Sequence, residues 1–100
     1  MVPSLSRGIP VVYILRLQSG ALYVGCTIDF EVRFRGHETG AACRTTSLDP
    51  PDVLVFVEIQ PDFRSERKRE LQIKRWSRAK KLALIEGNDA ELCRLSRSRD

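Results

Sequence analysis

The sequence predicts an α+β domain in which helices pack on a three-stranded, mostly antiparallel sheet, with the element order β-β-α-β-α-α. Three observations indicate this class: two strand-like runs on either side of a glycine-containing turn, a third run of apolar and β-branched residues, and helical patterns between and after them. The length of 100 residues leaves room for one core and excludes a multidomain enzyme. A content of 42% hydrophobic and 30% charged residues excludes a disordered or membrane-spanning chain.

The first two strands form a predicted β-hairpin. Residues 11–17 (VVYILRL) are β-branched, aromatic and aliphatic, and residues 21–25 (ALYVG) repeat this composition. The Gln-Ser-Gly segment between the two runs supplies turn residues. We therefore expect two antiparallel neighbours.

The first helix is predicted over residues 29–39, where two phenylalanines lie one helical turn apart. Thr27 or Asp29 is placed to cap its N-terminus, and Gly40 follows its last turn. Residues 40–52 (GAACRTTSLDPPD) are small, polar and proline-rich, which predicts a surface loop.

The third strand is predicted over residues 53–59 (VLVFVEI), the strongest strand signal in the chain. Its nearly continuous apolar character favours a strand that is buried on both faces or central in the sheet. Good helix formers then predict helices over residues 64–75 and 78–86. Ser77 is the expected N-cap of the second of these helices, and Gly87 its end.

The predicted domain covers residues 11–87. It is preceded by an N-terminal extension, residues 1–10, which lacks the apolar segment of a secretory signal. Residues 88–100 are expected to add one frayed turn around Leu92 and Cys93 and to end as a mobile basic tail.

Charge is distributed unevenly along the chain. The total is 17 Lys and Arg against 13 Asp and Glu, a net charge of +4. Residues 1–63 hold five basic and seven acidic side chains (5 − 7 = −2), whereas residues 64–100 hold twelve and six (12 − 6 = +6). A basic surface attracts polyanions, so nucleic acid is the first expected partner and an anionic membrane the second. The alternative is a solvated helix face that keeps the protein soluble.

Cysteine usage indicates a reducing compartment. Cys26, Cys43 and Cys93 are an odd number without a C-x-x-C pair, and His37 is the single histidine. A structural zinc site would need all four of these residues to converge, because zinc takes four nitrogen or sulfur ligands. We therefore expect free thiols and a cytoplasmic protein.

Chemistry-bearing residues are sparse. Asp62 and Glu66 could imitate a two-carboxylate nuclease site, but they lie too close in sequence, and we interpret them as a chance match. The phosphate-binding loop, the G-x-S-x-G motif and the H-E-x-x-H motif are absent from the sequence. The remaining candidates are two strand tyrosines and a glycine, two residues that flank the apolar face of the first helix, and one glutamate: Tyr13, Tyr23, Gly25, Arg33, His37 and Glu70.

Each helical candidate also has an ordinary interpretation. Arg33 and His37 could pack only their stems at the helix boundary and keep their polar ends in water. Glu70 could form an i,i+4 ion pair with Lys74, worth about 0.2–0.5 kcal/mol. Glu66, however, also lies four residues from Glu70 and repels it, so this pattern is not optimised for helix stability alone.

Taken in series, these residues resemble the GIY-YIG nuclease superfamily, in particular its small stand-alone branch. The matching segments are Val12-Tyr13-Ile14, Tyr23-Val24-Gly25, the run from Thr27 to His37, and the run from Glu70 to Lys81. The likeness extends from Val11 to Ile85 in the expected order and spacing. Two departures are Val12 in place of glycine and residues 40–47 (GAACRTTS), where relatives tend to carry more glycine, basic residues and an aromatic.

The resemblance implies a catalytic set made of Tyr13, Tyr23, Arg33, His37 and Glu70. Glu70 is implied to bind Mg²⁺ or Mn²⁺, weakly in the absence of DNA, because such an ion keeps several waters and takes further ligands from the phosphate. Arg33 would offset charge on the scissile phosphate, and His37 would hydrogen-bond the phosphate or the attacking water. Tyr13 is the expected general base, provided that nearby positive charge lowers its pKa.

A shared site also constrains the hairpin. A two-residue loop would place the two tyrosines on opposite faces of the sheet. A three-residue loop, residues 18–20, with Gly20 in the left-handed region, pairs Leu15 with Tyr23 and Tyr13 with Gly25. Both tyrosines then lie on one face, and Gly25 should leave space beside Tyr13 for a water or a phosphate. We predict the three-residue loop.

The sequence therefore predicts a metal-dependent endonuclease acting on DNA, structure-selective rather than sequence-selective, because no appended element reads bases. The alternative is a non-catalytic nucleic-acid-binding module with a vestigial site. A third interpretation is a protein docking surface on the second helix and the tail; Trp76 gives it some support, which burial of this residue in the core would remove. The sequence does not determine the oligomeric state. The expected nucleic-acid contacts are basic: Arg35, Arg44, Lys74, Arg75, Arg78, Lys80 and Lys81.

Overall fold

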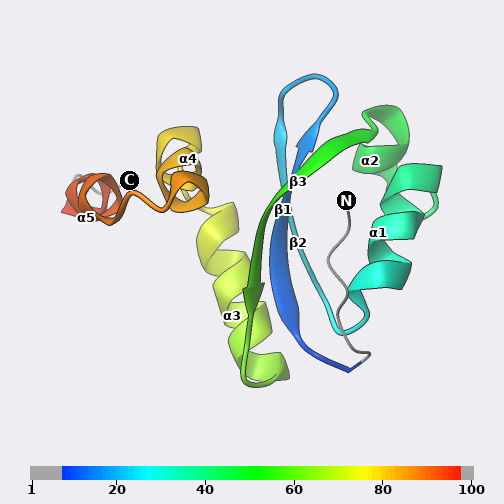
Figure 1. Cartoon of the computed structure of the whole chain (residues 1–100), viewed down its shortest axis with the longest axis horizontal. Coiled ribbons are helices and arrows are strands. Elements are labelled where there is room, and N and C mark those ends of the chain that lie inside the picture. The colour runs from blue at the N-terminus through cyan, green and yellow to red at the C-terminus, as the bar shows by residue number, and fades with distance from the viewer. Residues whose placement is uncertain (1–7, 98–100) are drawn as a thin grey trace.

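A computed structural model describes residues 8–97 of the chain. The sheet separates two helical layers: α1 and α2 lie on one side and α3 on the other, while α4 and α5 extend from the end of α3 (Figure 1). The elements in chain order are β1 (Val11–Leu17), β2 (Leu22–Thr27), α1 (Phe30–Thr39), α2 (Arg44–Leu48), β3 (Pro51–Ile59), α3 (Phe63–Lys74), α4 (Arg78–Glu86) and α5 (Asp89–Arg97).

The sheet is antiparallel throughout, with the strand order β2-β1-β3. This confirms the predicted fold class. The central strand is β1, whose side chains are buried except for Arg16, and not the segment 53–59 that the sequence favoured. β3 is an edge strand of mostly half-buried residues, because its apolar side chains pack against both cores while only one of its edges pairs with a described strand.

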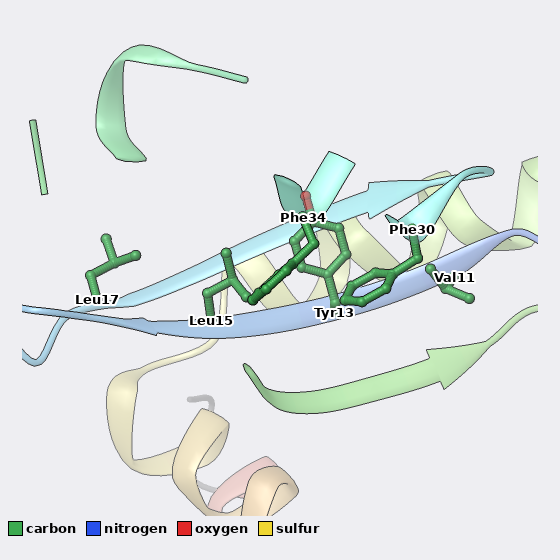
Figure 2. Close-up of a cluster of buried hydrophobic side chains, with 6 residues drawn as sticks. All are labelled: Val11, Tyr13, Leu15, Leu17, Phe30 and Phe34. Atoms are coloured by element: carbon green, nitrogen blue, oxygen red, sulfur yellow. The ribbon is translucent and has the colours of Figure 1, made fainter. Parts of the chain in front are cut away.

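Alternate residues of β1 enter two cores. Val11, Tyr13, Leu15 and Leu17 point to the side of α1, where its phenylalanines pack against them (Figure 2). Val12 and Ile14 point to the opposite side, and Ile73 of α3 packs against them. The period of two along a strand thus divides β1 between both helical layers.

The hairpin has the predicted three-residue loop. Gly20 has φ 94°, in the left-handed region that glycine enters without a steric cost. Leu15 pairs with Tyr23 and Tyr13 with Gly25, so the register expected for a shared tyrosine face is confirmed.

Helix ends follow the sequence signals. Asp29 caps α1 and Gly40, with φ 81°, ends it. The side chain of Asp62 accepts a hydrogen bond from the Ser65 N–H at 2.8 Å, so this residue caps α3 instead of joining a carboxylate pair. Ser77 caps α4, and Gly87 ends it with φ 70°. These boundaries lie within two residues of the predicted ones.

Two segments are more helical than predicted. The expected loop 40–52 contains α2, and the expected frayed turn after Gly87 is instead α5, which packs against α4. Residues 1–7 of the expected extension and 98–100 of the expected tail lie outside the described residues. The division into extension, domain and tail stays a prediction. Between residues 8 and 97, none of the helices combines the length and the apolar character that a membrane crossing requires.

Candidate active site

Tyr13 and Tyr23 lie on the face of the sheet that α1 covers. Tyr13 is 1% exposed, whereas Tyr23 is half-buried. A Cβ atom placed on Gly25 would lie 2.5 Å from both the Cζ and the hydroxyl oxygen of Tyr13. The space over Gly25 is therefore filled by the Tyr13 ring, and the expectation that a water or phosphate would occupy it is wrong.

His37, in the last turn of α1, is fully buried against Tyr13. Its Nε2 lies 2.6 Å from the Tyr13 hydroxyl, and its Nδ1 lies 2.8 Å from Oγ1 of Thr46. Burial lowers the pKa of His37 to about 4, and the charge of Arg33 acts in the same direction, so the ring is neutral at pH 7. Both nitrogens bind the protein, which differs from the expected hydrogen bond to a phosphate.

Tyr23 is linked to the same cluster through Cys43. The Cys43 Sγ lies 3.6 Å from the Tyr23 hydroxyl and 3.4 Å from Oγ1 of Thr46. The Tyr23 ring also meets the His37 ring edge-on, with the centroids 5.0 Å apart. Burial raises the pKa of Tyr23 to about 12.

The protonation of Tyr13 differs from the sequence expectation. Burial raises the pKa of the Tyr13 phenol, and this effect exceeds the opposing effect of Arg33. Arg33 is exposed on α1, and its charge favours the phenolate of both tyrosines. The protein alone therefore keeps Tyr13 protonated at neutral pH.

Glu70 lies on the opposite side of the sheet from Tyr13 and His37 (Figure 1), and of the two tyrosines it is Tyr23 on which its charge acts. It lies on the face of α3 that packs against β2, which is an edge strand. Glu70 and Glu66 also both act on the Cys26 thiol of β2. Burial and these two acids raise the pKa of Cys26 to about 12. Lys74 forms the expected ion pair with Glu70, at 3.4 Å.

The two buried carboxylates of α3 fit a hard divalent cation. Glu66 is 5% exposed, and its Oε2 is buried without a hydrogen-bond partner among the described residues. A buried oxygen without a partner costs stability unless something binds it. Residues 8–97 contain no group of three or more acidic, histidine or cysteine side chains that could hold a metal ion. Two carboxylates suit Mg²⁺, which retains several waters.

Three residues of this region were not among the predicted site residues. Cys43 and Thr46 belong to the segment that the sequence assigned to a loop, and small polar residues without apolar periodicity give no signal of burial. Glu66 was set aside as a chance match. Its repulsion with Glu70 at i,i+4 was the available signal, because two acids on one buried helix face destabilise the helix unless a cation lies near them.

The expected nucleic-acid contacts lie on both helical layers. Arg35 and Arg44 are exposed on the layer of α1 and α2, together with Arg33. Lys74, Arg75, Arg78 and Lys81 lie on α3 and α4, beside a groove that Lys68, Arg69, Arg75 and Trp76 help to line.

Lys80 differs from the other predicted contacts. It is 6% exposed, and its Nζ lies 4.5 Å from the centroid of the Trp76 ring. Arg69 lies over the same ring, at 5.3 Å. Lys80 therefore packs in the interior instead of presenting a free charge to a phosphate. Trp76 is half-buried: it packs against the core between α3 and the sheet and also lines the groove, so the protein docking surface stays a prediction.

This fold and this cluster define a small α+β catalytic domain built around a tyrosine pair on an antiparallel sheet. The chain belongs to the GIY-YIG family: the model of the GIY-YIG catalytic domain matches residues 9–83. The resemblance seen in the sequence is confirmed, and membership of this nuclease family supports a nuclease-like function.

Relatives of similar size share the family. A UPF0213 protein of Syntrophus aciditrophicus is 40% identical over 78 residues, which cover 77% of this chain and 90% of the relative. A UPF0213 protein of Xanthomonas axonopodis pv. citri is 36% identical over 74 residues, 74% of this chain and 72% of the relative. The solution NMR structure of a UPF0213 protein from Bacillus halodurans has a TM-score of 0.54 and 30% identity, and the match covers 80% of this chain and 85% of that one.

Proposed function

We propose that the protein is a metal-dependent endonuclease that hydrolyses phosphodiester bonds in DNA. The observation that carries this proposal is the cluster itself: Tyr13, Tyr23 and His37 on one face, the charge of Arg33 beside them, and Glu70 at the neighbouring sheet edge. The five residues come from β1, β2, α1 and α3. Core packing alone does not require an arginine and two buried carboxylates around a tyrosine pair.

The chain's own groups suit the removal of a proton from water. Because burial disfavours a free Tyr13 phenolate, we assign Tyr13 as a relay that takes the proton of the attacking water while donating its own to Nε2 of His37. No buried phenolate then forms. Tyr23 and Arg33 are the more exposed members of the cluster, and we place the phosphate between them.

Glu70 and Glu66 would hold a Mg²⁺ or Mn²⁺ ion. When bound, such an ion stabilises negative charge on the phosphoryl and leaving oxygens. In its absence Lys74 neutralises Glu70, so the ion has to displace the ammonium. We therefore expect weak metal binding without DNA and stronger binding with it.

The substrate in this proposal is DNA selected by its shape. The basic residues on both helical layers suit a phosphate backbone, which carries no sequence information. Single-stranded or branched DNA is the expected form. The three free cysteines agree with a cytoplasmic location, where thiols stay reduced.

Cleavage of a DNA panel tests the proposal. Single-stranded, duplex, flapped and four-way DNA, with an RNA strand for comparison, are incubated with the protein in Mg²⁺, in Mn²⁺ or in EDTA. We expect metal-dependent cleavage that Glu70→Ala and Arg33→Ala abolish. Glu86→Gln and Arg16→Ala, at exposed positions outside the cluster, are the matched controls and should cleave like the wild type.

The second candidate function is a nucleic-acid-binding module with a vestigial site. The burial of Tyr13 favours it, because the substrate has to reach a side chain that is 1% exposed. This alternative predicts salt-sensitive binding that Glu70→Ala leaves unchanged, and no cleavage in either metal. That result would overturn the nuclease proposal.

A further inference from the structure

Hydrogen-bonding groups connect the two tyrosines in a continuous chain through α1 and α2. From Tyr13 the chain passes to His37 at 2.6 Å and from His37 to Thr46 at 2.8 Å. From Thr46 it passes to Cys43 at 3.4 Å, and from Cys43 to Tyr23 at 3.6 Å. Two of its five members lie at or within α2, the segment for which the sequence predicted only a surface loop.

The number of exchangeable protons limits the directions in which the hydrogen bonds of this chain can point. Each of the five groups carries one exchangeable proton when His37 is neutral, so every contact receives one proton if all bonds point the same way. One proton is then left over at one end of the chain. If it were left on Tyr13, it would be buried on a side chain that is 1% exposed.

The half-buried Tyr23 is the better place for the remaining proton, because water can accept it there. The Cys43 thiol then donates to the Tyr23 oxygen, a direction that the geometry of this contact allows. Thr46 donates to Cys43, and Nδ1–H of His37 donates to Thr46. The Tyr13 hydroxyl therefore donates to Nε2.

Thr46 is the middle member of this hydrogen-bonded chain, between His37 and Cys43. It is fully buried although it lies in a helix of five residues whose other members are exposed. Its position depends on the packing of α2 and of the segment before it against α1, where a Cβ on Gly36 would lie 3.2 Å from the Cβ of Ala42. Burial of a hydroxyl is favourable only when the hydroxyl is hydrogen-bonded, and the partners here are His37 and Cys43.

We propose that Thr46 is a positioning residue: its hydroxyl holds His37 in the Nδ1-protonated tautomer, so that Nε2 faces Tyr13 as the acceptor of its proton. The inference rests on the proposed nuclease function for its catalytic consequence, but not for the tautomer itself. Without Thr46 the ring has no acceptor at Nδ1 and can protonate Nε2 instead, which would reverse the bond to Tyr13.

The tautomer can be read directly, because His37 is the single histidine and gives one set of ring signals. Long-range ¹H–¹⁵N spectra of the wild type should show a protonated Nδ1 and an unprotonated Nε2 at pH 7. A protonated Nε2 in the wild type would overturn the proposal without any variant, whether or not the protein cleaves DNA.

Three variants complete the test. Thr46→Val removes the hydroxyl at nearly constant volume and should lose the wild-type ring signals, while Thr46→Ser should keep them. Thr45→Val, at the exposed neighbouring position, is the matched control and should leave them unchanged. If Thr46→Val folds and retains the wild-type tautomer, the proposal fails.

Cleavage assays then separate this proposal from the nuclease proposal. We expect Thr46→Val to lower kcat about 10- to 100-fold with KM nearly unchanged, as for other groups that orient a functional histidine. Thr46→Ser should restore most of the rate. Wild-type cleavage with an unaffected Thr46→Val variant would refute only the role of Thr46. The wild-type tautomer together with the absence of cleavage would refute only the nuclease function.

Discussion

Gly25 determines where the Tyr13 ring can lie. The two residues face each other on neighbouring strands, and the ring of Tyr13 crosses the position that a side chain at residue 25 would occupy. The family motif therefore has a packing reason at this glycine: without a Cβ, the phenol can pass over β2 toward His37.

Gly25→Ala should displace the Tyr13 ring. A Cβ at 2.5 Å from the Cζ and the hydroxyl oxygen of Tyr13 requires a shift of this fully buried side chain, and overpacking of this kind costs about 1–3 kcal/mol. Urea unfolding should show this loss. Adding Tyr13→Val to the variant makes room, so the two changes together should cost less than their sum. Strict additivity would contradict the contact.

His37 should make the stability depend on pH. Its pKa is lowered from 6.5 to about 4 in the folded protein, so the unfolded chain binds more protons between these values. Folding stability should therefore fall as the pH drops from 7 toward 4, by about 2 kcal/mol at pH 5. Urea unfolding of the wild type and of His37→Gln at several pH values measures this dependence of stability on pH. The variant lacks the only imidazole of the chain and should show little change between pH 7 and pH 5.5.

At the scale of the element, α3 combines a structural and a chemical face. Ile73 anchors the helix in the core, while Glu66 and Glu70 present carboxylates to the edge strand β2. The Asp62 cap fixes where the helix starts and therefore which residues face the sheet. Two acids i,i+4 on a buried face weaken the helix unless a cation joins them.

Glu66→Gln should change stability and metal response in opposite directions. It removes a charge whose Oε2 is buried without a partner among residues 8–97, so the variant should be more stable in EDTA by about 1–2 kcal/mol. The rise in Tm that Mn²⁺ produces should be smaller than in the wild type. Glu86→Gln, at an exposed position, is the control. An unchanged Mn²⁺ effect in Glu66→Gln would exclude Glu66 as a ligand.

At the scale of the whole molecule, exposed basic side chains lie on both sides of the sheet. Arg35 and Arg44 are exposed on the layer of α1 and α2, and Arg78 and Lys81 lie on α4, beyond α3 (Figure 1). The positive net charge nevertheless comes from residues 64–100 (+6), because residues 1–63 carry −2 and the arginines of α1 and α2 lie among acidic side chains. A bent or branched DNA would meet both surfaces more readily than a straight duplex.

DNA binding should weaken with salt and depend on both layers. Arg35→Ser with Arg44→Ser, and separately Arg78→Ser with Lys81→Ser, should each lower the affinity and reduce the slope of log K against log[salt] by about two. Arg16→Ser, which removes a residue paired with Asp52, should leave the slope unchanged. Fluorescence anisotropy with single-stranded and four-way DNA in EDTA measures the affinity and its dependence on salt. If either pair has no effect, that layer does not contact DNA.

Local sequence signals were sufficient for most of the fold. The three-residue loop with Gly20, the caps at Asp29 and Ser77, and the ends at Gly40 and Gly87 depend on backbone geometry within a few residues. Strand order depends also on pairing between segments that are distant in sequence. Residues 53–59 form the more apolar run, yet β1 is the central strand, since β2 pairs with one of its edges and β3 with the other. Strand order therefore depends on pairing across the whole sheet and not on the composition of one segment.

By itself, the sequence determined the family, the fold class and the register that places Tyr13 and Tyr23 on one face, because turn geometry and strand alternation are local properties. Only the tertiary structure decided that Tyr13 fills the space over Gly25, that both nitrogens of His37 bind protein groups, and that Thr46 is buried in a helix. These outcomes depend on which segments pack together, and burial then changes the protonation of each group. The protonation state of a group depends on its burial, hydrogen bonds and neighbouring charges, and here these come from residues that are distant in sequence.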